Sequence, residues 1–289
     1  MPDTELPASL AVVLLGLLAS ASWGVSDFTG GWLSRRGPLL GVLVTTQLAG
    51  LALAVTAAVL RGEPGLRDSD LGWAILSGLL ASVGLAALYG GLAFGRMGVV
   101  APVTGLLVAT IPVVAGAILE GLPPPLALAG MGLAIVAVVV VSLSPDGGTG
   151  GPSGLRYALV AGLVIGCLTV VMSRFSDGRI FGPLAVMRLA EAGVFVVFIA
   201  LRRPRWRLER TAWPWAIGVG LVDLLGNGAY VAATQTGALA VAAVLSSLYP
   251  VVTVLLAAVV LSERLGRLHA TGVLLSGVAI AMIAGGLRA

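Results

Sequence analysis

The sequence predicts an all-α membrane protein, with ten transmembrane helices arranged as two inverted five-helix repeats. Three observations predict this class. First, 58% of the 289 residues are hydrophobic and only 10% are charged, and the mean hydropathy is +1.06; soluble domains average about 25% charged residues. Second, no residue from Leu224 to Ser262 carries a formal charge, which leaves room for a helix of about 20 residues across a bilayer core of about 30 Å. Third, the chain carries several sequence markers twice.

The duplicated markers lie at similar spacings. Gly98 and Gly237 each begin a long apolar run and are 139 positions apart, and the prolines inside those runs, Pro112 and Pro250, are 138 positions apart. A Gly-Pro-Leu triplet begins at residue 37 and again at residue 182, 145 positions later. The chain is therefore predicted to consist of two related halves.

Each half contains five apolar runs long enough to cross a membrane. We expect spans at Ala8–Leu33, Leu39–Leu60, Asp70–Gly95, Gly98–Leu119, Pro125–Leu143, Leu155–Ser173, Phe181–Leu201, Thr211–Gln235, Ala238–Leu261 and Leu268–Leu287. The Gly/Pro-rich segment 144–154 is the predicted linker between a first repeat, 1–143, and a second repeat, 155–289. An odd number of spans in each half gives the halves opposite orientations, as in secondary transporters whose site lies near the membrane midplane.

The composition argues against most enzymes and against nucleic-acid binding. All 17 basic residues are arginines, so the lysine that a P-loop requires is missing, and ATP-driven transport by this chain is excluded. The single cysteine, Cys167, excludes an internal disulfide and a cysteine-based metal cluster. There is no H-E-x-x-H motif and no nucleophile elbow, and the lone His269 lies beside a loop. We expect no catalytic residue, no cofactor, no metal and no nucleic acid partner.

The arginines bear on the orientation of the protein. They gather in the loops after the odd-numbered spans, most densely from Arg202 to Arg210. By the positive-inside rule, this places both termini outside the cell.

Charged side chains inside the spans are the first candidates for a site, because a charge at the bilayer centre costs roughly 2.5–3.5 kcal/mol unless it faces a partner or water. Asp27 follows Trp23 by four residues, so the two share a helix face. Asp27 either lines the transport pathway or lies at the membrane boundary. Asp223, Asn227 and Tyr230 form a second polar stripe, which either binds solute or holds helices together by hydrogen bonds.

The remaining candidates are an ion pair and two proline segments. Arg188 and Glu191 are three residues apart, and the favoured reading is a structural ion pair. Pro250 removes a backbone hydrogen bond, so it is predicted to break the ninth span near Ser246, Ser247 and Tyr249 and to expose groups that can bind a polar solute; the alternative is a plain hinge. Pro112, with Thr104 and Thr110, is the predicted counterpart in the first half, and Tyr89 is a predicted aromatic wall. Cys167 and Thr169 are weaker candidates for the same wall.

Two segments of this sequence resemble a known family. Trp23-Gly24-x-Ser26-Asp27-Phe28 is similar to the W-G-x-N-F opening of EamA-type transporters of the drug/metabolite transporter superfamily, with Asp27 where asparagine is commoner. Ser246–Leu275 is similar to the ninth span of that family and its Glu-Arg turn, whereas the first half has Glu120-Gly121-Leu122 without the arginine. Members are usually drawn with both termini cytoplasmic, opposite to the arginine distribution, so both orientations stay open.

The resemblance implies a carrier for small organic solutes such as amino acids, acting by alternating access at a central cavity, with many relatives acting as exporters. We expect substrate contacts from Trp23, Asp27, Tyr89, Asp223, Asn227, Tyr230, Ser246, Ser247 and Tyr249. Asp27 and Asp223 are the candidates for proton coupling, because buried carboxyl groups can exchange protons near neutral pH; otherwise the carrier is a facilitator. The expected partners are a small-molecule substrate and the lipid bilayer, and the expected location is a bacterial inner membrane. The alternative function is a non-transporting scaffold or lipid-handling protein.

Overall fold

The computed structural model describes residues 8–94, 97–142, 154–260 and 267–286, and within these ranges the secondary structure consists of α-helices. The predicted segments 144–153 and 261–266, the linker and the Glu-Arg turn, lie outside the described residues. The helices are α1 (Ala8–Ser34), α2 (Leu39–Leu60), α3 (Asp68–Phe94), α4 (Met97–Leu119), α5 (Pro125–Ser142), α6 (Leu155–Met172), α7 (Phe181–Arg202), α8 (Trp213–Thr236), α9 (Leu239–Ser246), α10 (Tyr249–Val260) and α11 (Arg267–Gly286).

The described helices are apolar and expose apolar side chains on their outer surface. Six of them, α1, α2, α3, α6, α7 and α8, are long and apolar enough to cross a membrane, and shorter apolar stretches lie at Val103–Leu119, Pro125–Ala137, Leu239–Thr253 and Ala270–Ile283. Leu60 is 82% exposed and Ile118 is 77% exposed. An apolar exterior of this kind suits hydrocarbon and would be poorly solvated by water.

Several helices begin or end at a residue whose backbone conformation favours that position. α2 begins directly after Pro38, whose φ of −67° suits a helix start, and α8 has Pro214 in its first two positions. α7 ends where Arg203 adopts a left-handed conformation with φ of 48°, a common way to stop a helix. Several connections are short, but most of the packing is between helices that are far apart in the sequence, such as α1 with α8 and α5 with α11.

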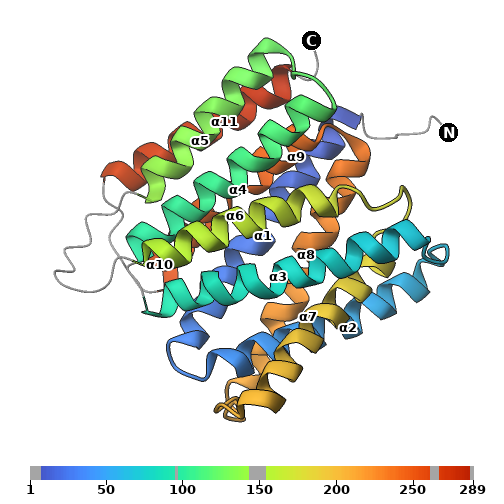
Figure 1. The fold of residues 1–289 in the computed structure, drawn as a ribbon. Helices are drawn as coiled ribbons and strands as arrows, with labels where there is room; N and C mark the ends of the chain where they lie inside the picture. The colour runs from blue at the N-terminus through green and yellow to red at the C-terminus, as the bar shows by residue number, and fades with distance from the viewer. Residues whose placement is uncertain (1–7, 95–96, 143–153, 261–266, 287–289) are drawn as a thin grey trace.

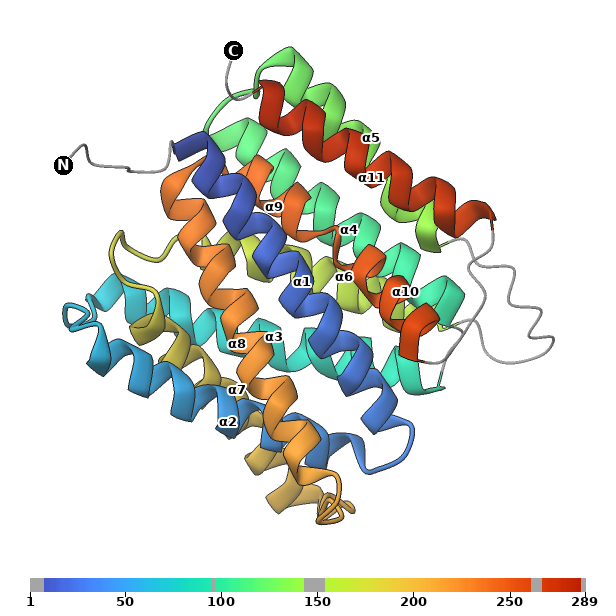
Figure 2. The same ribbon diagram turned by 180° about the vertical axis from the view of Figure 1, so that it is seen from behind.

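The helix contacts repeat between the two halves. α1 packs along α8 as α6 packs along α3, and α2 packs on α8 as α7 packs on α3. α4 packs on α6 as the α9–α10 pair packs on α1 (Figure 2), while α2 packs on its own counterpart α7 and α5 on its counterpart α11. This exchange pattern is what two related five-helix units produce when they face each other.

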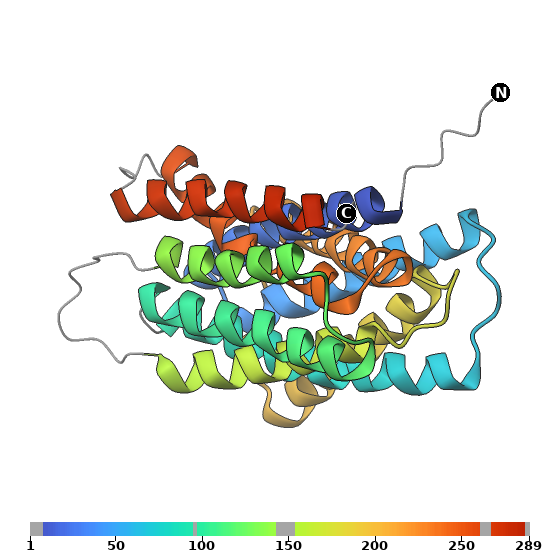
Figure 3. The same cartoon turned by 90° about the horizontal axis from the view of Figure 1, so that it is seen from above.

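Counterpart helices run in opposite directions. In the α5–α11 pair, Gly286 at the end of α11 lies against Ala127 at the start of α5, and Gly130 lies against Ile283 (Figures 1 and 3). In the α2–α7 pair, Glu63, just after α2, accepts a hydrogen bond from the backbone N–H of Phe181 at the start of α7. Both of these counterpart pairs are therefore antiparallel.

The bundle has two distinct ends. We call the end formed by segments 34–39 and 202–213 the basic end, where Arg35, the residue after α1, donates to the Leu92 carbonyl of α3. We call the end formed by segments 61–67, 120–124 and 173–180 the terminal end, because the described chain begins and finishes there (Figure 1).

The predicted break in the ninth apolar run is present, but its counterpart in the first half is not. Ser247 and Leu248 separate α9 from α10, and Pro250 is the second residue of α10 (Figure 2). α4, in contrast, continues through Pro112 as one helix. The missing N–H of a proline is tolerated in a helix that its neighbours hold, and α4 packs along α6, α9 and α5. The structure therefore has no helix break at Pro112, and the alternative of a plain hinge there stays a prediction.

Candidate functional site

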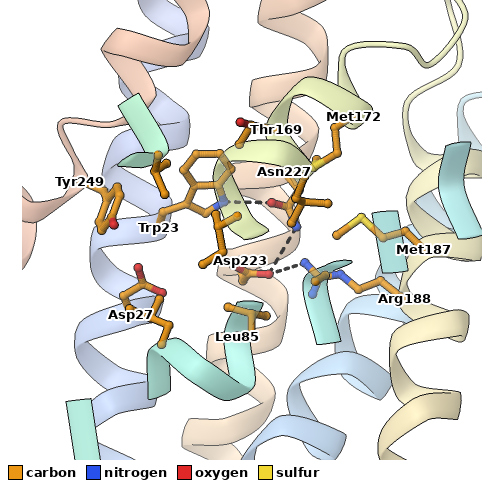
Figure 4. A pocket seen from close by; sticks show the side chains of 15 residues that line it. Trp23, Asp27, Leu85, Thr169, Met172, Met187, Arg188, Asp223, Asn227 and Tyr249 are labelled. Carbon is orange, nitrogen blue, oxygen red and sulfur yellow. Dashed lines mark hydrogen bonds and ion pairs between the residues drawn. The ribbon is translucent and has the colours of Figure 1, made fainter. Parts of the chain in front are cut away.

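A small cavity lies at the interface between the two halves. Its volume is about 60 Å³, and α1, α3 and α4 of the first half line it together with α6, α7, α8 and α10 of the second. Apolar walls come from Leu85, Leu88, Ile165 and Met187. The polar lining comes from Trp23, Asp27, Thr169, Arg188, Asp223 and Asn227, with Tyr249 beside them (Figure 4).

A chain of polar side chains crosses one side of this cavity. The Arg188 guanidinium, which is 0% exposed, donates from Nη1 to Gln47 Oε1 on α2 and from Nη2 to Asp223 Oδ2 on α8. Asn227 Nδ2 lies 3.4 Å from the same Asp223 oxygen. Asn227 Oδ1 in turn accepts from Trp23 Nε1 of α1 at 2.9 Å. Four helices, α1, α2, α7 and α8, are thus connected through one buried network.

The expected Arg188–Glu191 pair is only part of this arrangement. Glu191 Oε2 lies 3.7 Å from Arg188 Nη1, at the predicted i,i+3 spacing, but Asp223 is the closer carboxylate. Both carboxylate oxygens of Glu191 are buried without a hydrogen-bond donor among the described residues. Arg188 therefore pairs with carboxylates on two helices, Glu191 on α7 and Asp223 on α8.

Asp27 has a different environment. Its carboxylate lines the cavity and has no hydrogen-bond or ion-pair partner within the described chain. In Figure 4, Asp27 lies beside Tyr249 on the side of the cavity away from Arg188. Arg35 and Arg36, the neighbours that a membrane-boundary position would use, lie about two turns further along α1, where Arg35 donates to Leu92 O. A carboxylate and a guanidinium thus face one small space from opposite sides.

Tyr89 and Tyr230 flank the cavity and do not line it. Tyr230 is 0% exposed, donates its hydroxyl hydrogen to the Thr169 carbonyl at 3.0 Å and packs on Trp23 with ring centroids 5.5 Å apart. Tyr89 is buried against Gly30 of α1. Each tyrosine therefore connects the third apolar helix of its half to the first.

The two serines before Pro250 do not reach the cavity. The hydroxyl groups of Ser246 and Ser247 donate to the carbonyls of Ala243 and Val244, at 3.0 and 2.8 Å. Serine hydroxyls often bond to a nearby carbonyl of their own helix, and both residues are buried. Of this predicted cluster, the structure brings only Tyr249 to the cavity.

The two candidate threonines of the first half also donate their hydroxyl hydrogens to backbone carbonyls. Thr110 donates to Leu106 O in its own helix, and Thr104 donates to Ala158 O, which connects α4 to α6. Thr169 lines the cavity, whereas Cys167, two residues earlier on α6, does not.

Gln47 is the site residue that sequence reasoning missed. It is 1% exposed and contacts Arg188 from α2. The available signal was the amide itself, since Gln47 lies within an uncharged run of a predicted span. An amide there needs a hydrogen-bond partner, but the sequence does not say on which helix.

Comparisons with known proteins agree with this architecture. The model of the EamA-like transporter family matches residues 10–143 and again residues 152–285. A solved structure titled "Crystal structure of protein" is similar to this chain with a TM-score of 0.75 and 20% sequence identity, over 98% of this chain and 99% of that one. That likeness shows the fold alone. No curated protein matches. Because the family model accounts for both halves, the chain belongs to the EamA-like transporter family, and it is an integral, multi-pass membrane transporter of small solutes.

Proposed function

We propose that this protein is a secondary-active or facilitative exporter of small organic solutes such as amino acids, working by alternating access at the cavity between its halves. The observation that carries the proposal is the pairing of opposite charges around one cavity. Arg188 borders it on one side and the partnerless Asp27 on the other. A solute that bears both a carboxylate and an ammonium group would find a counter-charge at each end.

The size of the cavity supports alternating access. A space of about 60 Å³ holds a few water molecules, whereas sites for organic ligands usually measure about 300–1,000 Å³. Binding of an amino acid therefore requires the lining helices to separate. In the present conformation the site is too small for such a solute.

We further propose that the apolar segments cross the bilayer ten times, with the two halves in opposite orientations. The antiparallel counterpart pairs α2–α7 and α5–α11 support this topology. Single cysteines can be introduced at Ser9, near the start of α1, and at Arg156, near the start of α6. One of them should react with an impermeant thiol reagent in intact cells, and the other only after the membrane is permeabilised. Labelling of both positions from the same face would contradict the inverted topology.

Proton coupling, if present, would run through Asp27 or Asp223. The two differ in environment, since Asp223 binds Arg188 while Asp27 has no partner in the described structure. A carboxyl group without a counter-charge in a membrane cavity is the better proton carrier, because its charge is not already compensated. Asp27 is therefore our first candidate for proton coupling, binding a proton and the ammonium group of the solute in turn, and Asp223, which pairs with Arg188, is assigned to solute binding on the other side of the cavity.

Flux into proteoliposomes tests the proposal. A thermal-shift screen against amino acids, nucleosides and organic cations selects the solute, and its flux is then measured with and without a pH gradient. Asp223→Asn should lower flux at least about tenfold, which corresponds to a loss of about 1.4 kcal/mol, under both conditions. Asp27→Asn should abolish the response to the gradient. Asp68→Asn is the matched control, because Asp68 is exposed at the start of α3.

Two outcomes would overturn the proposal. Normal flux by Asp223→Asn under both conditions would remove that residue from the mechanism. Absence of flux for every stabilising solute would instead favour the alternative, a membrane scaffold or lipid-handling protein.

A further inference from the structure

A second hollow lies on the outer surface of the bundle, away from the central cavity. Its volume is about 1110 Å³, and it shares no lining residue with the central cavity. Residues from α2, α7 and α8 line it, together with the segment between α7 and α8. Because α2 packs on both α7 and α8 while those two helices contact each other little, α2 forms the floor of a groove, and α7 and α8 form its sides.

The walls of this groove are apolar. Leu48 of α2, Val196 of α7 and Ile217 of α8 line it, and all three are exposed. The α2 residues that line it run from Val44 to Ala49, which is about 8 Å along a helix axis. The groove therefore descends from the basic end into the depth at which lipid acyl chains lie.

The end of the groove that lies nearest the basic end of the bundle is positively charged. Arg207 and Arg210 line it there, flanked by Trp206 and Trp213. Neither arginine has an ion-pair or hydrogen-bond partner in the described part of the chain. Tryptophan and arginine at a helix end are typical of the level of lipid headgroups, so the polarity of the groove changes along its length as that of a phospholipid does.

The loop that carries these arginines is packed in place. Gly41 at the start of α2 touches the backbone carbonyl of Trp206, and a Cβ atom at this position would collide with it. Leu208 packs on the same glycine. The backbone that carries the two arginines is therefore fixed beside the groove by the close approach of loop and helix.

We propose that this groove binds one anionic phospholipid, with its phosphate between Arg207 and Arg210 and an acyl chain along Leu48, Val196 and Ile217. A second copy of the chain is a poorer occupant. A symmetric contact presents the same patch from both subunits, which would bring the arginines of the 202–210 segment against their own copies. A lipid supplies the missing negative charge and apolar surface together.

Native mass spectrometry of the purified protein in detergent tests the proposal, with phosphatidylglycerol and phosphatidylcholine of identical acyl chains as probes. The wild type should retain one phosphatidylglycerol and bind it more tightly than phosphatidylcholine. Arg207→Ala/Arg210→Ala should weaken phosphatidylglycerol binding roughly 30-fold, from about 1 kcal/mol for each arginine. Arg202→Ala/Arg205→Ala, the matched control in the same segment but outside the groove, should bind as the wild type does.

A second variant separates lipid binding from simple phosphate binding. Leu48→Trp fills the apolar part of the groove without changing charge, and it should weaken phosphatidylglycerol binding while both arginines remain. Glycerophosphate, which has the phosphate but no acyl chain, should not compete. Equal binding of the two lipids, equal losses in the two arginine pairs, or full binding by Leu48→Trp would each overturn the proposal.

Discussion

Tyr89 and Tyr230 occupy corresponding places in the two halves, 141 positions apart, yet each connects the third apolar helix of its half to the first in a different way. The Tyr230 hydroxyl donates to Thr169 O, and its ring packs on Trp23. The Tyr89 hydroxyl has no hydrogen-bond partner within the described residues, and its ring is held by contact with Gly30. Tyr230 faces the terminal end and Tyr89 faces the basic end.

The terminal end is further fastened by a network of loop contacts, which we define by Glu63, Asp70, Arg179 and Gln235. Asp70, 0% exposed, accepts from the backbone N–H of Ser176 at 2.9 Å and lies 3.7 Å from Arg179. Glu63 accepts from the backbone N–H groups at the start of α7. Gln235 donates to the carbonyls of Ser176 and Arg179. The α2–α3 and α6–α7 connections are thus bound together.

At the basic end, α1 and α3 meet through a different set of contacts. It consists of Tyr89 packed on Gly30 and of Arg35 donating to Leu92 O at 3.3 Å. The loop beyond it, 203–212, is rich in arginine, whereas its counterpart in the first half, 61–67, contributes Glu63 to the network. Among the described residues, the duplicated scaffold is therefore closed by different contacts at its two ends, and we expect the basic end to open at lower cost.

Asp70→Ala should have the largest effect on stability, because it weakens the network at the terminal end. It removes a buried carboxylate, leaves the backbone N–H groups of Ser176 and Arg67 without their acceptor, and takes away the counter-charge of Arg179. Loss of one partner from a buried pair costs about 3–5 kcal/mol, and we expect about 3 kcal/mol in thermal unfolding of the purified protein. Asp68→Ala, at the exposed start of the same helix, is the control. A loss below about 1 kcal/mol would mean that the terminal end is not fastened by this network.

Gly30→Ala should lower stability by an intermediate amount, through its effect on the basic end. A Cβ atom there collides with the Tyr89 ring, and overpacking costs about 1–3 kcal/mol, partly offset by the better helix propensity of alanine. Gly72→Ala, on α3 where a Cβ atom meets open space, should stabilise the protein slightly. Comparison of the two melting temperatures checks the prediction, and equal shifts would show that Tyr89 does not seal α1 against α3.

Removal of the two tyrosine hydroxyls should give the smallest effects and the sharpest comparison. Tyr230→Phe loses the bond to Thr169 O and should cost about 1 kcal/mol. Tyr89→Phe should leave stability unchanged or raise it slightly, because its buried hydroxyl has no partner in the described structure. Parallel denaturation of the two variants measures the difference. Equal losses would contradict the unequal closure of the two ends.

Much of the fold could be predicted from the sequence. The resemblance to EamA-type transporters is confirmed by the match of the family model to both halves. Uncharged runs and duplicated markers such as Pro112 and Pro250 predicted helices in two related units, because bilayer length and backbone hydrogen bonding leave few other choices. The family match leaves the solute, the coupling ion and the role of each predicted site residue as predictions.

Pairs of site residues could be predicted only where both residues lie on the same helix. Trp23 and Asp27, or Asp223 and Asn227, share a helix face at i,i+4 spacing, and the structure brings all four to the cavity. The Gln47–Arg188 contact joins residues 141 positions apart, so it depends on how α2 packs on α7. The terminal-end network likewise joins loops more than a hundred residues apart, and such contacts leave no local pattern.

The central claim is that one cavity is reached from both faces of the membrane in turn. A single cysteine at Leu85, which lines the cavity, can be introduced into a Cys167→Ser background and reconstituted in one orientation. An impermeant thiol reagent is then applied to each face separately. We predict reaction from both faces, faster from the face of the basic end, with Asp70→Ala raising the rate from the other face. Reaction from one face alone, unchanged by Asp70→Ala and by the transported solute, would contradict the account.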